Sequence, residues 1–126
     1  MPAVVVFLVD VILVAVFATI GRISHAEGLS LAGVAETAWP FLAGVVLGWI
    51  VAHSWKRGAP RTVVEGIPVW AVTVIAGMLL RHAVGQGTAT AFIIVATVTL
   101  AVFLLGWRFV ARLIITKRTS SRPSSA

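Results

Sequence analysis

Four long apolar runs fill most of this 126-residue sequence, and charged residues stand almost only at the junctions between the runs. An apolar helix of about 20 residues matches the thickness of a lipid bilayer. Hydrophobic residues make up 60% of the chain and charged residues 11%, too few charges to cover the surface of a water-soluble domain. The sequence therefore predicts an all-α fold, a polytopic membrane four-helix bundle.

The predicted spans cover about residues 3–23, 37–55, 63–83 and 89–113, within one transmembrane domain of residues 1–116. Pro40 and Pro68 are expected in the first turns of the second and third spans, where a missing N–H does little harm. Residues 29–37 are expected to form a short helix on the outer membrane surface. Residues 117–126 are basic and have nothing to bury, so they are predicted to form a disordered cytoplasmic tail.

Basic residues are unevenly shared between the two sides that four spans create. Both termini and the loop at 56–62 fall on one side with eight of the ten Lys and Arg residues, and the other side holds Arg22 and Arg81. Loops rich in Lys and Arg stay in the cytoplasm. We therefore predict a multi-pass protein of the cell (inner) membrane with cytoplasmic N and C termini. Its expected surroundings are the lipid bilayer and anionic lipid headgroups.

The composition also excludes several functions. The net charge of +6 does not indicate nucleic-acid binding, because the basic residues flank apolar runs and form no stripe with interleaved aromatic residues. The chain has no cysteine for a disulfide, a thiolate nucleophile or an iron–sulfur site. It also has no Ser/His/Asp set, phosphate-binding loop or paired carboxylates. We expect neither enzyme activity nor a cofactor.

One acid, Asp10, lies inside the first apolar run. The helical period places it on a bundle-facing stripe with Val14, Phe17, Gly21 and His25. An unpaired acid in the bilayer costs about 2.5–3.5 kcal/mol, so a partner is expected. Depth along the helices favours an intramembrane ion pair with Arg108, with His53, Thr73 or a water as substitutes. Two interpretations stay open: a structural pair that fixes helix register, and an ion-sensitive site on a transport path.

The fourth run offers two candidate inward faces. One face contains Phe92, Ala96, Thr99 and Phe103, and the nearly opposite face contains Thr90, Thr97, Ala101 and Arg108. Because Arg108 matches the depth of Asp10, we predict that the second face points into the bundle.

Small residues mark helix-packing faces on the second and third runs. Gly44 and Gly48 form a GxxxG motif, and Gly77 lies on a similar stripe of the third run. Such residues let two helix backbones approach closely. We predict that they pack helices within the chain, with contact to a second copy or another membrane protein as the alternative.

On the outer side, polar residues at the helix ends are expected to form a cluster. Its members are Arg22, His25, Glu27, Glu36, Arg81 and His82. No HxxxH or HxxE spacing places two ligands on one helical face, so no metal site is predicted. The two arginines are expected to reach lipid headgroups, with binding of an anion or a lipid phosphate as the alternative.

The five tryptophans are predicted to anchor the helices at the membrane interfaces, with Trp49 lying deeper than the others. The interfacial positions are Trp39, Trp55, Trp70 and Trp107. Leu47-Gly48-Trp49 and Leu105-Gly106-Trp107 form an internal echo, which chance similarity between apolar helices explains equally well.

Four motifs together resemble a family of small four-span membrane proteins of actinobacteria and haloarchaea, catalogued as a domain of unknown function. They are Asp10…Phe17…Gly21-Arg22…His25, Thr37-Ala38-Trp39-Pro40-Phe41 with Gly44, Thr73…Gly77-Met78…Arg81, and Gly106-Trp107-Arg108. The resemblance covers about residues 3–113. It implies four helices and a role in the family for Asp10, Arg22, His25, Arg81 and Arg108. It implies no activity, substrate or cofactor.

Two functions are compatible with these features. The first is a small transporter or permeation module, with Asp10 as its ion-sensitive residue and the outer cluster as its vestibule. The second is a noncatalytic accessory or scaffold subunit that binds another membrane protein through the Gly44/Gly48 face. A homo-oligomer is compatible with either function. An enzyme acting on lipid is a distant third possibility.

Overall fold

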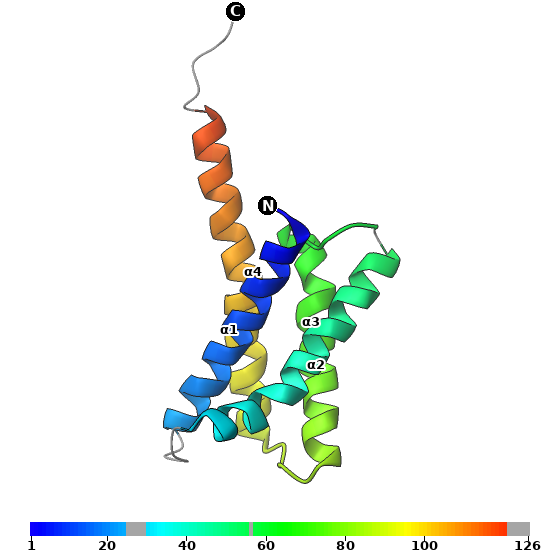
Figure 1. Ribbon diagram of the computed structural model, residues 1–126, viewed down its shortest axis with the longest axis vertical. Helices are drawn as coiled ribbons and strands as arrows, with labels where there is room; N and C mark the ends of the chain where they lie inside the picture. The colour runs from blue at the N-terminus through cyan, green and yellow to red at the C-terminus, as the bar shows by residue number, and fades with distance from the viewer. Residues whose placement is uncertain (25–29, 56, 121–126) are drawn as a thin grey trace, which may run out of the picture.

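The computed structural model describes residues 1–24, 30–55 and 57–120 (Figure 1). The regular structure of these residues is helical, in the order α1 (Ala3–Ser24), α2 (Leu31–Trp55), α3 (Val63–Ala83) and α4 (Thr90–Ser120). Each helix packs along the next one in the chain, and α4 also packs on α1. The N-terminus and the α2–α3 connection lie at the same end of the bundle. We call it the basic end, because Arg57, Arg61, Arg108 and Arg112 belong to it.

All four helices are long and apolar enough to cross a membrane. Their outward faces are apolar, as α1 illustrates with exposed Leu8, Ile12, Val16 and Ile20. The buried polar side chains of the described residues are instead Asp10, Thr73 and Arg108. This is the inverse of a water-soluble bundle and fits lipid as the solvent. The predicted all-α, four-span architecture is confirmed, and the chain has the form of a multi-pass membrane protein.

Helix α2 begins six residues before the predicted second span. The Ser30 Oγ accepts a hydrogen bond from the Gly33 N–H at 3.0 Å and caps its first turn. Pro40 therefore lies well inside α2, not in its first turn as predicted. Figure 1 shows the first turns of α2 running across the end of the bundle before the helix bends along it. The surface helix expected at residues 29–37 is part of α2 from Leu31 onward, and residue 29 lies outside the described residues. The bend is explained by the proline.

The bend in α2 is bridged by a side chain from the α3–α4 connection. Pro40 has no N–H to donate to the backbone oxygen of Glu36, four residues earlier. The Gln86 Nε2 donates to this oxygen at 3.1 Å. The Gln86 side-chain oxygen accepts in turn from Arg81 Nη1 at 3.2 Å. We call Glu36, Pro40, Arg81 and Gln86 the kink clamp, because together they satisfy the carbonyl that the proline frees.

Helix α3 begins with a capping box. The Thr62 Oγ1 accepts from the Glu65 N–H at 3.1 Å, and the Glu65 Oε1 accepts from the Thr62 N–H at 3.1 Å. This pair sets the start of the helix at Val63. Pro68 consequently lies in the second turn of α3, one turn deeper than predicted.

Helix α4 contains 31 residues and continues past the basic end of the bundle (Figure 1). We call residues 109–120 the α4 extension. The prediction of a disordered tail from Lys117 is wrong for residues 117–120, which continue the helix. Each residue added to an existing helix gains one backbone hydrogen bond, so a helix continues readily through Lys and Arg. Residues 121–126 of the predicted tail lie outside the described residues.

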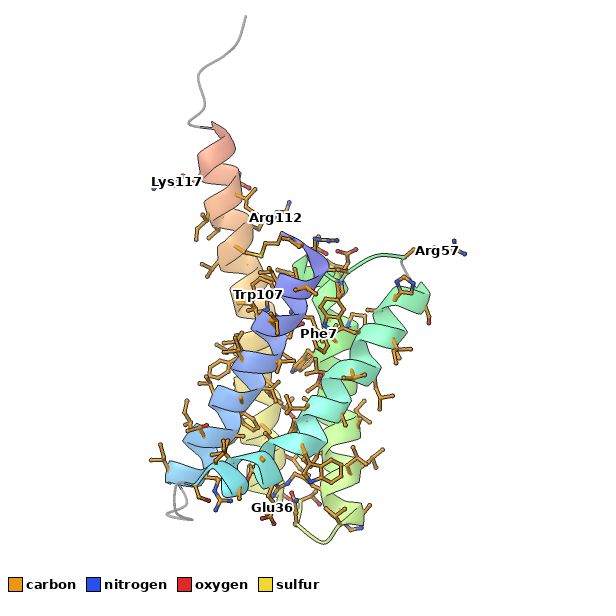
Figure 2. All side chains as sticks on the ribbon, viewed as in Figure 1. Phe7, Glu36, Arg57, Trp107, Arg112 and Lys117 are labelled. Atoms are coloured by element: carbon orange, nitrogen blue, oxygen red, sulfur yellow. The ribbon has the colours of Figure 1, made fainter. Side chains whose placement is uncertain are left out.

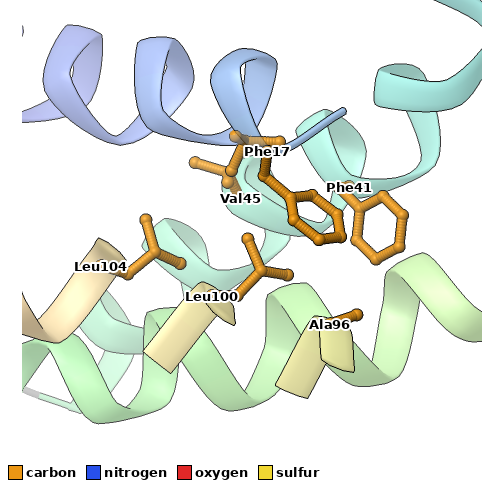
Figure 3. Packing of buried hydrophobic residues seen from close by; sticks show 7 residues of the cluster. Phe17, Phe41, Val45, Ala96, Leu100 and Leu104 are labelled. Carbon is orange, nitrogen blue, oxygen red and sulfur yellow. The ribbon is translucent and has the colours of Figure 1, made fainter. Parts of the chain in front are cut away.

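The core is formed where α1, α2 and α4 meet, as Figure 3 shows. Its buried members are Val14, Phe17, Phe41, Val45, Ala96, Leu100 and Leu104. On α4 the buried positions recur every fourth residue and continue to Arg108. The predicted inward face with Thr90, Thr97 and Ala101 is therefore wrong apart from Arg108. Residues four apart on a helix differ by about 40° in direction around its axis, so a line of such residues winds slowly around α4. The buried line therefore begins on the face of Ala96 and ends on the face of Arg108.

The GxxxG motif brings α2 against α3. A methyl group added at Gly44 would lie 2.8 Å from the backbone oxygen of Thr73, and one added at Gly48 would lie 2.9 Å from the Val69 Cα. At Gly77 an added methyl group would overlap the Phe41 ring. All three glycines therefore pack helices within the chain, and α3 covers the face predicted as an alternative for a partner.

Candidate functional site: a buried ion pair at the basic end

The Asp10 carboxylate is completely buried and faces the Arg108 guanidinium. Arg108 Nη1 lies 2.8 Å from Asp10 Oδ1, and Arg108 Nη2 lies 2.7 Å from Asp10 Oδ2. Two parallel N–H···O bonds of this kind are the strongest geometry available to an arginine and a carboxylate. The pair predicted from helix depth is therefore present, and it is bidentate.

Two tryptophans complete the coordination of Asp10. Trp107 Nε1 donates to Oδ1 at 2.9 Å, and Trp49 Nε1 donates to Oδ2 at 2.9 Å. The Trp49 ring is supported by the edge-on ring of Phe7, with centroids 5.2 Å apart. A carboxylate has about four lone-pair positions. Four N–H groups therefore saturate Asp10.

Arg108 is equally well satisfied, with 1% of its surface exposed. Its Nε donates to the backbone oxygen of Pro60 at 2.8 Å, and Nη1 also donates to the backbone oxygen of Leu104 at 2.7 Å. The guanidinium carbon lies 4.9 Å from the centre of the Trp107 ring, a cation–π distance. No buried side-chain nitrogen or oxygen in the described residues lacks a hydrogen-bond partner.

This arrangement connects three helices and packs against the fourth. Asp10 comes from α1, Trp49 from α2 and both Trp107 and Arg108 from α4. Helix α3 makes room for the arginine at Gly66, where an added methyl group would lie 2.7 Å from the Arg108 Cδ. We call Asp10, Trp49, Trp107 and Arg108 the ion-pair lock. Figure 2 shows Trp107 near the basic end, on the side of α4 that faces α1.

Interfacial anchoring is the wrong interpretation for Trp49 and Trp107, because their indole N–H groups bind the buried carboxylate. The signal that could have identified them is the echo Leu47-Gly48-Trp49 and Leu105-Gly106-Trp107, whose two tryptophans meet at Asp10. Trp70 donates to the backbone oxygen of Thr97 at 3.0 Å. Trp39 is exposed, as an anchor would be, and the side chain of Trp55 lies outside the described part.

The described polar residues at the opposite end make contacts along the helix ends. Arg22 Nη1 donates to the Thr37 hydroxyl at 3.2 Å, and its guanidinium packs on Gly33. Arg81 serves the kink clamp and stacks on Phe92, with 4.3 Å between the guanidinium carbon and the ring centre. His82 is exposed, and His25 and Glu27 lie outside the described residues. Among the described residues, no three His, Asp or Glu side chains gather where they could hold a metal ion.

Comparison with known proteins places this architecture in a family. The family model described as "Protein of unknown function (DUF3054)" matches residues 7–111. The chain belongs to this family. No curated protein and no solved structure matches the chain.

The DUF3054 match includes the whole ion-pair lock and ends within the α4 extension. In this family member the lock leaves Asp10 no lone-pair position for an ion, a water or a substrate. Its chemical capacity is therefore electrostatic and mechanical: it neutralises two buried charges and fixes the mutual positions of α1, α2 and α4.

Proposed function

We propose that this DUF3054 protein is a noncatalytic accessory or scaffold subunit of a membrane complex, in which the ion-pair lock has a structural role. The observation that carries the proposal is the saturation of the buried Asp10 carboxylate by four N–H donors. A proton- or cation-carrying acid needs a free lone pair or a nearby water path. In the lock, each direction of approach is already occupied by an indole or by the guanidinium.

The partner surface of this proposal is the α4 extension. The Gly44/Gly48 face is unavailable, because α3 packs against both glycines. Beyond the basic end, α4 presents an apolar surface formed by Phe109, Val110, Leu113 and Ile114, each with more than half of its surface exposed. A helix from a partner membrane protein fits such a surface by ordinary side-chain packing.

The proposal is tested by photo-crosslinking in native membranes. A crosslinker at Leu113 or Ile114 should capture one defined protein, whereas a crosslinker at Ile12, which is similarly exposed on α1, should capture lipid. Equal protein capture at both places would contradict a partner at the α4 extension.

The transporter alternative predicts a different result. Wild-type protein in proteoliposomes would carry a proton or cation flux above that of protein-free vesicles, and Asp10→Asn would abolish it in protein that still elutes as a folded species. The scaffold proposal predicts no flux above the protein-free control.

We also propose that the basic end faces the cytoplasm of a cell membrane. Eight of the ten Lys and Arg residues of the chain belong to that side of the topology. Because the chain has no cysteine, labelling of a single introduced cysteine shows on which side of the membrane that position lies. A membrane-impermeant maleimide added to intact cells should label Val84→Cys and leave Arg57→Cys unlabelled. The reverse pattern would invert the topology.

A further inference from the structure

A cavity of about 360 Å³ opens at the basic end, between the start of α1, the start of α3 and the α4 extension. Its walls combine charged and apolar side chains. They include Val6, Arg61, Trp107, Ala111, Arg112 and Ile115, and Arg108 of the ion-pair lock contributes to the inner side. A polar site with an apolar floor at the edge of a membrane bundle is suited to an amphiphilic molecule.

The arginines give this cavity a positive charge, and only one of them is neutralised by an acid. Arg108 is neutralised by Asp10, but Arg61 and Arg112 are exposed. The Arg61 Nε donates to the backbone oxygen of Met1 at 2.8 Å. Within the described residues, the Arg61 Nη groups and the Arg112 guanidinium make no hydrogen bond or ion pair. Glu65 lies near in sequence, but its carboxylate is bound in the α3 capping box and it does not line the cavity. Two guanidinium groups are therefore available to an anion.

The apolar part of the cavity continues along α4. A second cavity of about 650 Å³ shares Trp107, Ala111 and Ile115 with the first and adds Val110 and Ile114. Figure 2 shows Arg112 on α4 at the level of the N-terminal end of α1, so the cations stand at the bundle end of this apolar groove. A soluble anion would use the arginines alone, whereas a phospholipid would use both the arginines and the groove.

We propose that this cavity is a binding site for an anionic phospholipid. The headgroup phosphate lies between Arg61 and Arg112, which suit it because a guanidinium donates two parallel N–H bonds to phosphate oxygens. An acyl chain lies along Trp107, Ala111 and Ile115, which line both cavities and are not part of the proposed partner surface. The site does not depend on the proposed scaffold function, because it requires only the bundle and a surrounding bilayer.

The test is native mass spectrometry of the full chain released from detergent micelles that contain equal amounts of phosphatidylglycerol and phosphatidylcholine. The wild type should retain phosphatidylglycerol preferentially. Arg61→Gln and Arg112→Gln should each lower this retention about fivefold, in proportion to one lost cation at a membrane surface. Arg57→Gln removes an exposed basic residue of the same loop that does not line the cavity, and it should leave the retention unchanged.

Equal losses in all three variants would overturn the proposal in favour of a general charge effect, and so would unchanged retention in all three. An arm with excess inorganic phosphate separates a lipid from a soluble anion: retention that survives the phosphate supports the lipid site, and loss of the lipid to phosphate contradicts it. Ala111→Phe fills the groove without removing a charge, so it should also lower retention. The melting temperature of each lipid-free variant checks that the bundle is folded.

Discussion

The Arg108 guanidinium and the Asp10 carboxylate face each other in a bidentate pair, 2.8 and 2.7 Å apart, at a depth where neither group meets solvent. Both charges are buried, so each depends on the other for its stability. Breaking such a pair on one side costs about 3–5 kcal/mol, because the remaining charge is left uncompensated.

We therefore predict that Asp10→Asn and Arg108→Gln each lower the free energy of unfolding in detergent by about 3–5 kcal/mol. The double variant should lose less than the sum of the two, because the second substitution removes the stranded charge. Thermal unfolding followed by circular dichroism measures this, with Arg57→Gln as the exposed control. Additive losses would mean that the two residues act separately.

The tryptophans of the lock allow a milder test. Trp49→Phe and Trp107→Phe keep an aromatic ring and remove one N–H donor from the buried carboxylate. Each should cost about 1–3 kcal/mol, since an acceptor is left unsatisfied. Trp39→Phe is the matched control, because Trp39 is 40% exposed and its indole is not one of the donors to Asp10. If all three substitutions had the same small effect, the indole bonds would contribute nothing specific.

The ion pair was predictable from helix geometry, whereas the tryptophan donors left only the short Leu-Gly-Trp echo in the sequence, and the difference has a physical reason. The rise of a helix is fixed, so the depths of Asp10 and Arg108 follow from residue counting, and a buried acid requires a partner. An indole at the end of a span has the same sequence signature whether it anchors in headgroups or donates inward. Only the three-dimensional path of α2 and α4 brings Trp49 and Trp107 to the same carboxylate.

The same distinction applies at the opposite end. Charges at helix ends predict a polar cluster there. The sequence does not show, however, which residue donates a hydrogen bond to a backbone carbonyl that a proline has freed. Pro40 identifies the carbonyl of Glu36, and nothing along the chain indicates that Gln86, fifty residues later, fills it.

Close packing of α2 on α3 gives a third prediction. Gly44→Ala should lower the free energy of unfolding by about 1–3 kcal/mol, the usual cost of inserting a methyl group into a packed interface. The added methyl group would meet the Thr73 backbone, which cannot move aside as a side chain would. Gly21→Ala is the control, because apart from its own stretch of helix nothing lies within 4 Å of its added methyl group. Thermal unfolding of both variants checks the difference, and a tolerated Gly44→Ala would contradict the close approach.

The kink clamp gives the last prediction. Gln86→Ala removes the donor to the Glu36 carbonyl and should destabilise the bundle by about 0.5–1.5 kcal/mol, the usual net contribution of one hydrogen bond. Pro40→Ala restores a backbone N–H four residues after Glu36, so in that background the α-helix supplies its own donor. Gln86→Ala should then cost little, although Pro40→Ala itself changes the bend of α2. A double-mutant cycle by thermal unfolding measures this coupling. Independent effects of the two substitutions would show that Gln86 stabilises the fold through some contact other than the carbonyl that Pro40 leaves open.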